Sequence, residues 1–152
     1  MQQLTSRRGG PRLLSAAVVG WAACLTCVIV GRASQTQTVW SGVYTEAQAY
    51  RGEKVADTTC IGCHGSGLNG GDSGPKLVGD VFLANWSRQS VAELFDWIRE
   101  AMPSDAPGTL SKEETAAVLA YILKLNKMPA GKQALSSERD ELSRIEMTVG
   151  RP

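Results

Sequence analysis

The chain has 152 residues, of which 43% are hydrophobic, and this length and composition suit one globular domain. Its 16 basic and 15 acidic side chains nearly cancel, so the chain lacks the strongly basic surface that nucleic-acid binding requires. Beyond residue 33 the balance is mildly acidic, with 12 basic and 15 acidic side chains.

An apolar stretch from residue 13 to residue 30 dominates the N-terminal part of the chain. Four arginines flank it: Arg7, Arg8, Arg12 and Arg32. With the small residues Gly31 and Ala33 after it, the pattern is typical of a secretory signal peptide cleaved after Ala33. Eighteen mostly apolar residues also reach the lower limit for crossing a bilayer, so an uncleaved anchor is the alternative. We expect an exported, periplasmic protein with a signal peptide or membrane anchor over residues 1–33.

A first helix is predicted from Thr45, a favourable N-cap, to about Asp57. Gly52 interrupts it with a poor helix former, and a close contact with another helix is a plausible reason.

Two cysteine pairs share one spacing, Cys24-x-x-Cys27 and Cys60-x-x-Cys63, so their context must separate them. We interpret the first pair as small residues of the apolar segment. The second pair continues into His64, and C-x-x-C-H is the attachment pattern of a c-type haem. Each thiol can add to a haem vinyl group, and His64 then lies beneath the iron as an axial ligand.

Other functions of this motif fit the chain less well. A structural zinc site needs four ligands, whereas the predicted exported part contains two cysteines and one histidine. A thioredoxin-like pair would follow a strand, but the preceding segment looks helical. A disulfide between Cys60 and Cys63 remains an alternative.

A glycine-rich loop is predicted from Gly65 to Gly79, where it would cover one side of the haem. The capping box formed by Ser90 and Glu93 begins a second predicted helix. Its apolar stripe should face the haem and consists of Val91, Leu94, Phe95 and Ile98.

The second axial ligand must be a methionine, a rarer ligand or absent, because His64 is the single histidine. Met102 lies at the end of the second predicted helix and precedes Pro103, where a helix cannot easily continue and a loop can hold the side chain. We expect Met102 to be the ligand and regard Met128 as the next candidate; Met147 lies in a polar tail.

A third helix is predicted from the capping box of Ser111 and Glu114. Its apolar positions repeat at helical spacing: Val118, Leu119, Ile122 and Leu125. Small residues on this helix would permit close approach of the first helix: Ala116, Ala117 and Ala120.

Two further expectations concern residues outside these motifs. Four side chains are candidates to meet the haem propionates, although the tryptophans could equally serve as packing: Asn85, Trp86, Arg88 and Trp97. Residues 133–147 carry many charges and could form a polar helix, so we expect residues 132–152 to be a solvated appendage after a domain over residues 34–131.

The order of these elements across residues 43–131 resembles a class I cytochrome c. More narrowly, Gly74-Pro75-Lys76-Leu77, Phe82-Leu83, Met102-Pro103 through Pro107-Gly108, Leu110-Ser111 and residues 119–123 resemble small cytochromes c associated with quinoprotein (pyrroloquinoline quinone) dehydrogenases. The chain departs from this group in its tail and in Asn126-Lys127, where Asn-Gly is usual. The resemblance implies an all-α fold of three main helices around one covalently bound haem c, with Cys60 and Cys63 as thioether anchors and His64 and Met102 as axial ligands.

These features predict an electron-transfer protein and not an enzyme. It would carry single electrons between a dehydrogenase and a respiratory acceptor, with a quinoprotein dehydrogenase and a terminal oxidase as candidate partners. The alternative is an electron-transfer subunit of a membrane or quinoprotein dehydrogenase complex. A haem sensor or peroxidase would need an open sixth site. We expect no nucleic-acid partner, and contact with a membrane only if residues 1–33 remain attached.

Overall fold

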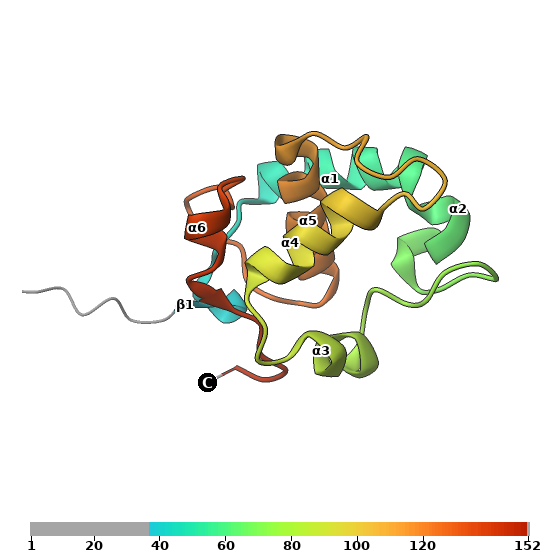
Figure 1. Ribbon diagram of the computed structural model, residues 1–152. Helices are drawn as coiled ribbons and strands as arrows, with labels where there is room; N and C mark the ends of the chain where they lie inside the picture. Colours follow the sequence, from blue (N-terminus) through green and yellow to red (C-terminus); the bar gives the residue numbers. More distant parts are fainter. Residues whose placement is uncertain (1–36, 152) are drawn as a thin grey trace, which may run out of the picture. The chain divides into compact units, whose positions relative to one another are not determined.

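The computed structural model describes residues 37–151. The predicted signal peptide or anchor, with Cys24 and Cys27, lies outside the described residues. The helices are α1 (Glu46–Thr59), α2 (Ile61–His64), α3 (Asp80–Trp86), α4 (Val91–Ala101), α5 (Lys112–Leu125) and α6 (Arg139–Leu142) (Figure 1). No helix in residues 37–151 combines the length and the apolar content needed to cross a membrane.

The three predicted helices are present as α1, α4 and α5. Thr45 caps α1 by accepting a hydrogen bond from the backbone of Gln48, as predicted, and the helix extends two residues beyond Asp57. The Glu93 carboxylate accepts the Ser90 backbone N–H at 2.6 Å. The Glu114 carboxylate accepts the Ser111 N–H at 2.9 Å in the same way. These reciprocal caps satisfy backbone donors that a helix start leaves unpaired, so local sequence sets where α4 and α5 begin.

The most extensive packing between two elements of the described residues is that of α1 against α5. A Cβ atom at Gly52 would overlap the carbonyl oxygen of Ala117, so the two backbones touch at this point. This confirms the interpretation of Gly52 as a contact glycine. Ala116 and Ala120 are also buried, and the small side chains of α5 allow the helices to approach.

Several short elements were not predicted, among them α2, α3 and a small sheet. The N-cap of α3 is Gly79, whose φ of 85° is in the left-handed region, and no side chain caps this helix. A two-stranded parallel sheet joins β1 (Gln37–Thr38) to β2 (Ile145–Glu146), with Gln37 opposite Ile145. This sheet ties the first described residues to the C-terminal segment.

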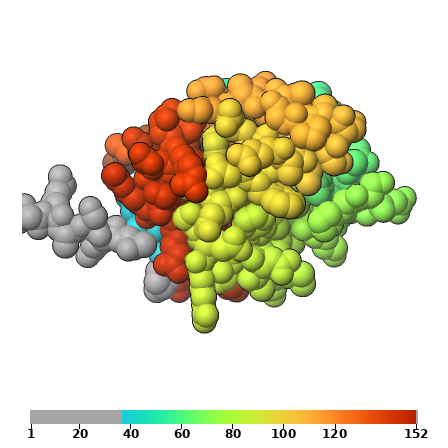
Figure 2. Space-filling model, viewed as in Figure 1, coloured from blue at the N-terminus to red at the C-terminus, as the bar shows by residue number. Residues whose placement is uncertain are grey.

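The expectation of a solvated C-terminal appendage is wrong. Four apolar side chains of this segment are buried in the core: Leu135, Leu142, Ile145 and Met147. The side chain of Gln48 in α1 donates to the Leu135 carbonyl at 2.8 Å and accepts the Leu135 N–H at 2.7 Å. Figure 2 shows the segment, in red, lying against the yellow surface of α4. Residues 135–147 therefore form part of the folded domain.

Candidate cofactor site

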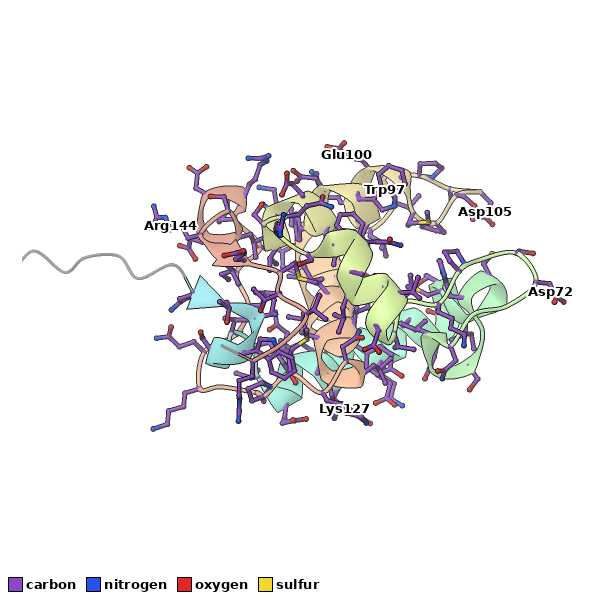
Figure 3. The ribbon with its side chains drawn as sticks, turned by 90° about the horizontal axis from the view of Figure 1, so that it is seen from below. Asp72, Trp97, Glu100, Asp105, Lys127 and Arg144 are labelled. Carbon is purple, nitrogen blue, oxygen red and sulfur yellow. The ribbon has the colours of Figure 1, made fainter. Side chains whose placement is uncertain are left out.

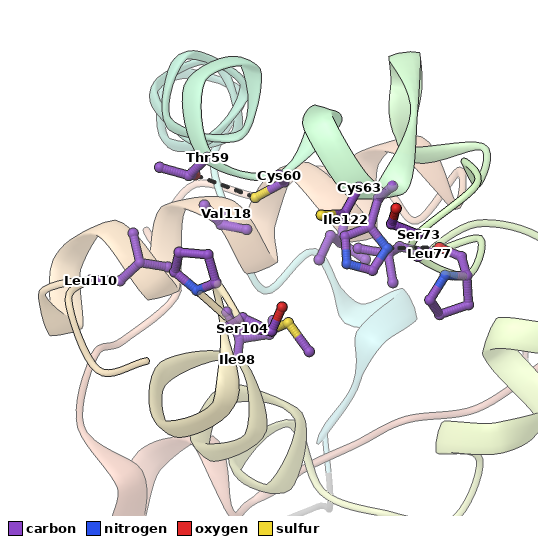
Figure 4. Close-up of a pocket in the computed structure, with 15 residues that line it drawn as sticks. Thr59, Cys60, Cys63, Ser73, Leu77, Ile98, Ser104, Leu110, Val118 and Ile122 are labelled. Carbon is purple, nitrogen blue, oxygen red and sulfur yellow. Dashed lines mark hydrogen bonds between the residues drawn. The ribbon is translucent and has the colours of Figure 1, made fainter. Parts of the chain in front are cut away.

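A single apolar cavity brings together the residues of the C-x-x-C-H motif and Met102 (Figure 4). The space between its lining atoms amounts to about 650 Å³, including a part that is open to solvent. The walls come from α1, α2, α4, α5 and two loops. The lining residues that the argument uses are Cys60, Cys63, His64, Pro75, Ile98 and Met102.

His64 ends α2 and is 8% exposed. Its Nδ1 lies 2.7 Å from the carbonyl oxygen of Pro75. Because a carbonyl can only accept a hydrogen bond, Nδ1 must carry the hydrogen, which assigns the tautomer of the neutral ring. The lone pair is then on Nε2, and an imidazole oriented through its other nitrogen is the usual arrangement of a metal ligand.

The glycine-rich loop fits closely around this histidine. A Cβ atom at Gly74 would lie 3.0 Å from both His64 Nδ1 and the Cys63 carbonyl oxygen. A Cβ at Gly71 would overlap the same carbonyl oxygen. The loop therefore needs glycine at these two positions to bring the Pro75 carbonyl within hydrogen-bonding distance of the ring.

The two cysteines are free thiols with different environments. Cys60 is half-buried at the end of α1, and Cys63 is exposed. Burial raises the pKa of the Cys60 thiol, while the Thr59 hydroxyl at 3.4 Å opposes this effect. Both sulfurs belong to the cavity lining, and Figure 4 shows them beside the space between α1, α4 and α5.

Of the candidate methionines, Met102 lines the cavity. Its backbone N–H closes α4 by bonding the Ile98 carbonyl at 3.1 Å, and its extended backbone begins the loop that the sequence predicts there. Met128 and Met147 are 3% and 0% exposed and belong to the hydrophobic core. A thioether and an imidazole thus share one cavity with two thiols.

Two expectations about the cavity need correction. Of the apolar stripe on α4, Ile98 lines the cavity, whereas Val91, Leu94 and Phe95 pack in the core instead. The stripe extends beyond the cavity, so its other residues pack against the rest of the hydrophobic core. That core includes the C-terminal segment that was expected to lie in solvent.

The four propionate candidates are not among the residues that line the cavity. Trp86 and Trp97 line a separate shallow groove together with Glu93, Asp96 and Glu100. Trp97 is 56% exposed and lies near Glu100 in Figure 3. The sequence did not identify Pro75 as the hydrogen-bond acceptor of His64. Its acceptor atom is a backbone carbonyl oxygen, which every residue has, so the residue type does not indicate it.

The comparisons with known proteins identify the class of this domain. Residues 47–122, half of the chain, match the sequence model of the family described as cytochrome c oxidase, cbb3-type, subunit III. The chain belongs to this family of cytochrome c domains and has the class I cytochrome c fold. Such domains bind haem c covalently and transfer electrons.

Among solved structures, the sulfane dehydrogenase SoxCD from Paracoccus pantotrophus is similar at 19% sequence identity and a TM-score of 0.49. The match covers 74% of this chain and 61% of the SoxCD chain. The chain thus spans about three fifths of the length of that protein chain. No curated protein sequence matches.

The residues of the cavity fit a haem c group. Two thiols on one turn of chain can be thioether anchors, and the imidazole and thioether are the two side chains that a His/Met-ligated haem requires. Within residues 37–151 no three His, Cys, Asp or Glu side chains gather as they would around another metal ion. The remaining lining is mainly apolar, with Thr59, Ser73 and Ser104 as its polar members, and this suits a haem macrocycle.

Proposed function

We propose that Cys60 and Cys63 anchor one haem c, that His64 and Met102 are its axial ligands, and that the protein is an exported carrier of single electrons. One observation carries this proposal: the two thiols, the imidazole and the thioether line the same apolar cavity. When bound, the haem supplies a one-electron couple between Fe(II) and Fe(III).

The protein's own side chains would tune this couple. The hydrogen bond from His64 Nδ1 to Pro75 increases the basicity of Nε2 and fixes the plane of the ring. The soft thioether of Met102 favours Fe(II) and so raises the reduction potential relative to a second histidine. If His64 and Met102 both bind the iron, no iron position would be open to oxygen or peroxide, and this ligand set would suit electron transfer and not sensing or peroxidase chemistry.

The test of the ligand assignment compares Met102→Ala with Met128→Ala in the holoprotein. Met102→Ala should abolish the weak near-infrared band of sulfur-to-iron(III) ligation and lower the reduction potential by an amount on the order of 0.1 V, within the roughly 0.8 V that axial ligands span. Met128→Ala removes a core methionine and should keep the band while lowering stability. Loss of the band in Met128→Ala alone would reassign the ligand.

A second candidate function is supported by the family match, whose description names a subunit of cytochrome c oxidase. That description supports the domain as an electron-transfer subunit of a larger complex, for which the sequence analysis named a membrane or quinoprotein dehydrogenase complex. Native purification separates the two candidates: a carrier elutes at the mass of one chain, whereas a subunit elutes with its complex. The mass of the purified chain also tests export, because cleavage after Ala33 leaves Ser34 as the first residue.

A further inference from the structure

Asn126 connects the end of α5 to the glycine-rich loop on the histidine side of the cavity. It follows the last residue of α5 and is 7% exposed. Its side-chain Nδ2 donates to the Leu77 carbonyl at 3.0 Å and to the Ile122 carbonyl at 2.8 Å. Its Oδ1 accepts the backbone N–H of Gly79 at 2.9 Å. Both amide hydrogens and the carbonyl oxygen of this side chain are therefore used.

These hydrogen bonds join two walls of the cavity. Leu77 in the loop and Ile122 in α5 both line it, and the single Nδ2 group of Asn126 bonds the carbonyls of both. Among the side-chain hydrogen bonds formed within residues 37–151, those of Asn126 are the ones that link α5 to residues 65–79. A buried amide in this position costs free energy unless every polar atom is paired, so the geometry is strongly constrained.

The loop segment that Asn126 holds also carries the acceptor of the histidine. Pro75 lies two residues before Leu77, and its carbonyl accepts the hydrogen bond from His64 Nδ1. Leu77 is held on its other side by its backbone N–H, which bonds the Leu68 carbonyl at 2.9 Å. Leu77 is thus bonded to the start of its own loop through Leu68 and to the helical core through Asn126.

We propose that Asn126 is a positioning residue for His64: it holds residues 77–79 against α5 and thereby keeps the Pro75 carbonyl on His64 Nδ1. This inference rests on the proposed ligation by His64. It assigns a cofactor-site role to a residue that does not line the cavity, because Asn126 acts through the loop backbone. The expected consequence of its loss is a weaker Nδ1–H hydrogen bond, not a missing ligand.

Gln48 offers a matched control. It is also a buried amide, 4% exposed, and it also makes two hydrogen bonds to backbone far away in the chain. Those bonds are to Leu135 in the C-terminal segment and not to the cavity. Asn126→Ala and Gln48→Ala therefore remove comparable interactions, and only Asn126→Ala should weaken the hydrogen bond of His64 Nδ1.

The experiment measures solvent exchange of the His64 Nδ1–H by NMR in the reduced holoprotein. In Asn126→Ala this exchange should be about tenfold faster than in wild type, the effect of weakening one buried hydrogen bond. In Gln48→Ala it should stay within about twofold of wild type. Equal acceleration in both variants, or in neither, overturns the inference.

Asn126→Asp provides a second variant in case Asn126→Ala does not fold. Below the ordinary pKa of an aspartate, its protonated carboxyl can donate to the Leu77 carbonyl and accept from Gly79; above it, the carboxylate can only accept. Relative to wild type at the same pH, exchange should be fast at neutral pH and recover in acid. Acceleration that is the same at both pH values overturns the inference. A wild-type spectrum without a haem-bound histidine would instead overturn the proposed ligation itself.

Discussion

The cofactor end and the closing end of the domain are built on different principles. The cofactor end, residues 60–79 and 102–110, surrounds an apolar cavity with a half-buried thiol, an exposed thiol and loops. The closing end, residues 132–148 with β1, buries Leu142 and Met147 completely. Figure 1 shows α2 and β1 on opposite sides of the described domain. We infer that the first end is shaped to receive haem and that the second supplies stability without contact with it.

The largest expected effect on stability comes from the closing end. Leu142→Ala removes a side chain that is 0% exposed and should lower the free energy of unfolding by about 3 kcal/mol, since buried Leu→Ala changes cost roughly 2–5 kcal/mol. Denaturant unfolding of the holoprotein measures this. The near-infrared band and the reduction potential should stay as in wild type.

Val149→Ala is the control for that variant, because Val149 follows this segment directly and is 44% exposed. Its free energy of unfolding should change by no more than about 0.5 kcal/mol. If Leu142→Ala shifted the potential as strongly as Met102→Ala, the two ends would not be independent and the comparison would fail.

A smaller effect on stability is expected in α1, the helix that runs between the closing end and the cofactor end. Gly52→Ala places a methyl group against the Ala117 carbonyl and should lower the free energy of unfolding by about 2 kcal/mol, typical of overpacking. Gly62→Ala is the helical control, since outside its chain neighbours and the backbone of its own helix no atom lies within 4 Å of its added Cβ. That change should be neutral or stabilising by up to about 1 kcal/mol. Equal destabilisation in both variants would refute the contact at Gly52.

The comparison also explains which features were predictable from the sequence. Helices α4 and α5 begin at Ser90 and Ser111, where both members of each capping box are local and visible in the sequence. The attachment motif is contiguous, and Met102 was found through its neighbour Pro103. Residues of α4 and α5, the attachment motif and Met102 line one cavity, whereas the capping boxes lie outside its lining.

The closing end depends on distant partners, and its sequence gives weak signals. Leu135, Leu142, Ile145 and Met147 are spaced by seven, three and two residues, so the spacing changes from a helical one to a strand one and no single period runs through the segment. Gln48 and Asn126 are polar residues whose burial makes sense only beside the backbone groups they bond, which lie 87 and 49 residues away in the chain. Helix α3 was missed because it is short and begins without a side-chain cap.

The smallest predicted effect is a pH dependence at the junction of α1 with the chain after α5. The Tyr44 hydroxyl donates to the Met128 carbonyl at 2.7 Å, and burial, with the Glu46 charge, raises the pKa of Tyr44 to about 12. The unfolded chain loses this proton near pH 10, whereas the folded chain retains it. Between these values the folded state binds more protons, so the free energy of unfolding falls as pH rises from about 10 towards 12.

Tyr44→Phe isolates this contribution. The variant should lose about 1 kcal/mol at neutral pH, because the Met128 carbonyl loses its donor, and its stability should fall less steeply between pH 10 and pH 12. Some slope should remain, since burial also raises the pKa of Tyr121. Denaturant midpoints at pH 7, 10 and 11.5 would measure both effects. An unchanged slope would show that Tyr44 has the same pKa in the folded and unfolded states. Loss of the near-infrared band of sulfur-to-iron(III) ligation in Tyr44→Phe would show that the Tyr44 contact also affects the cofactor end.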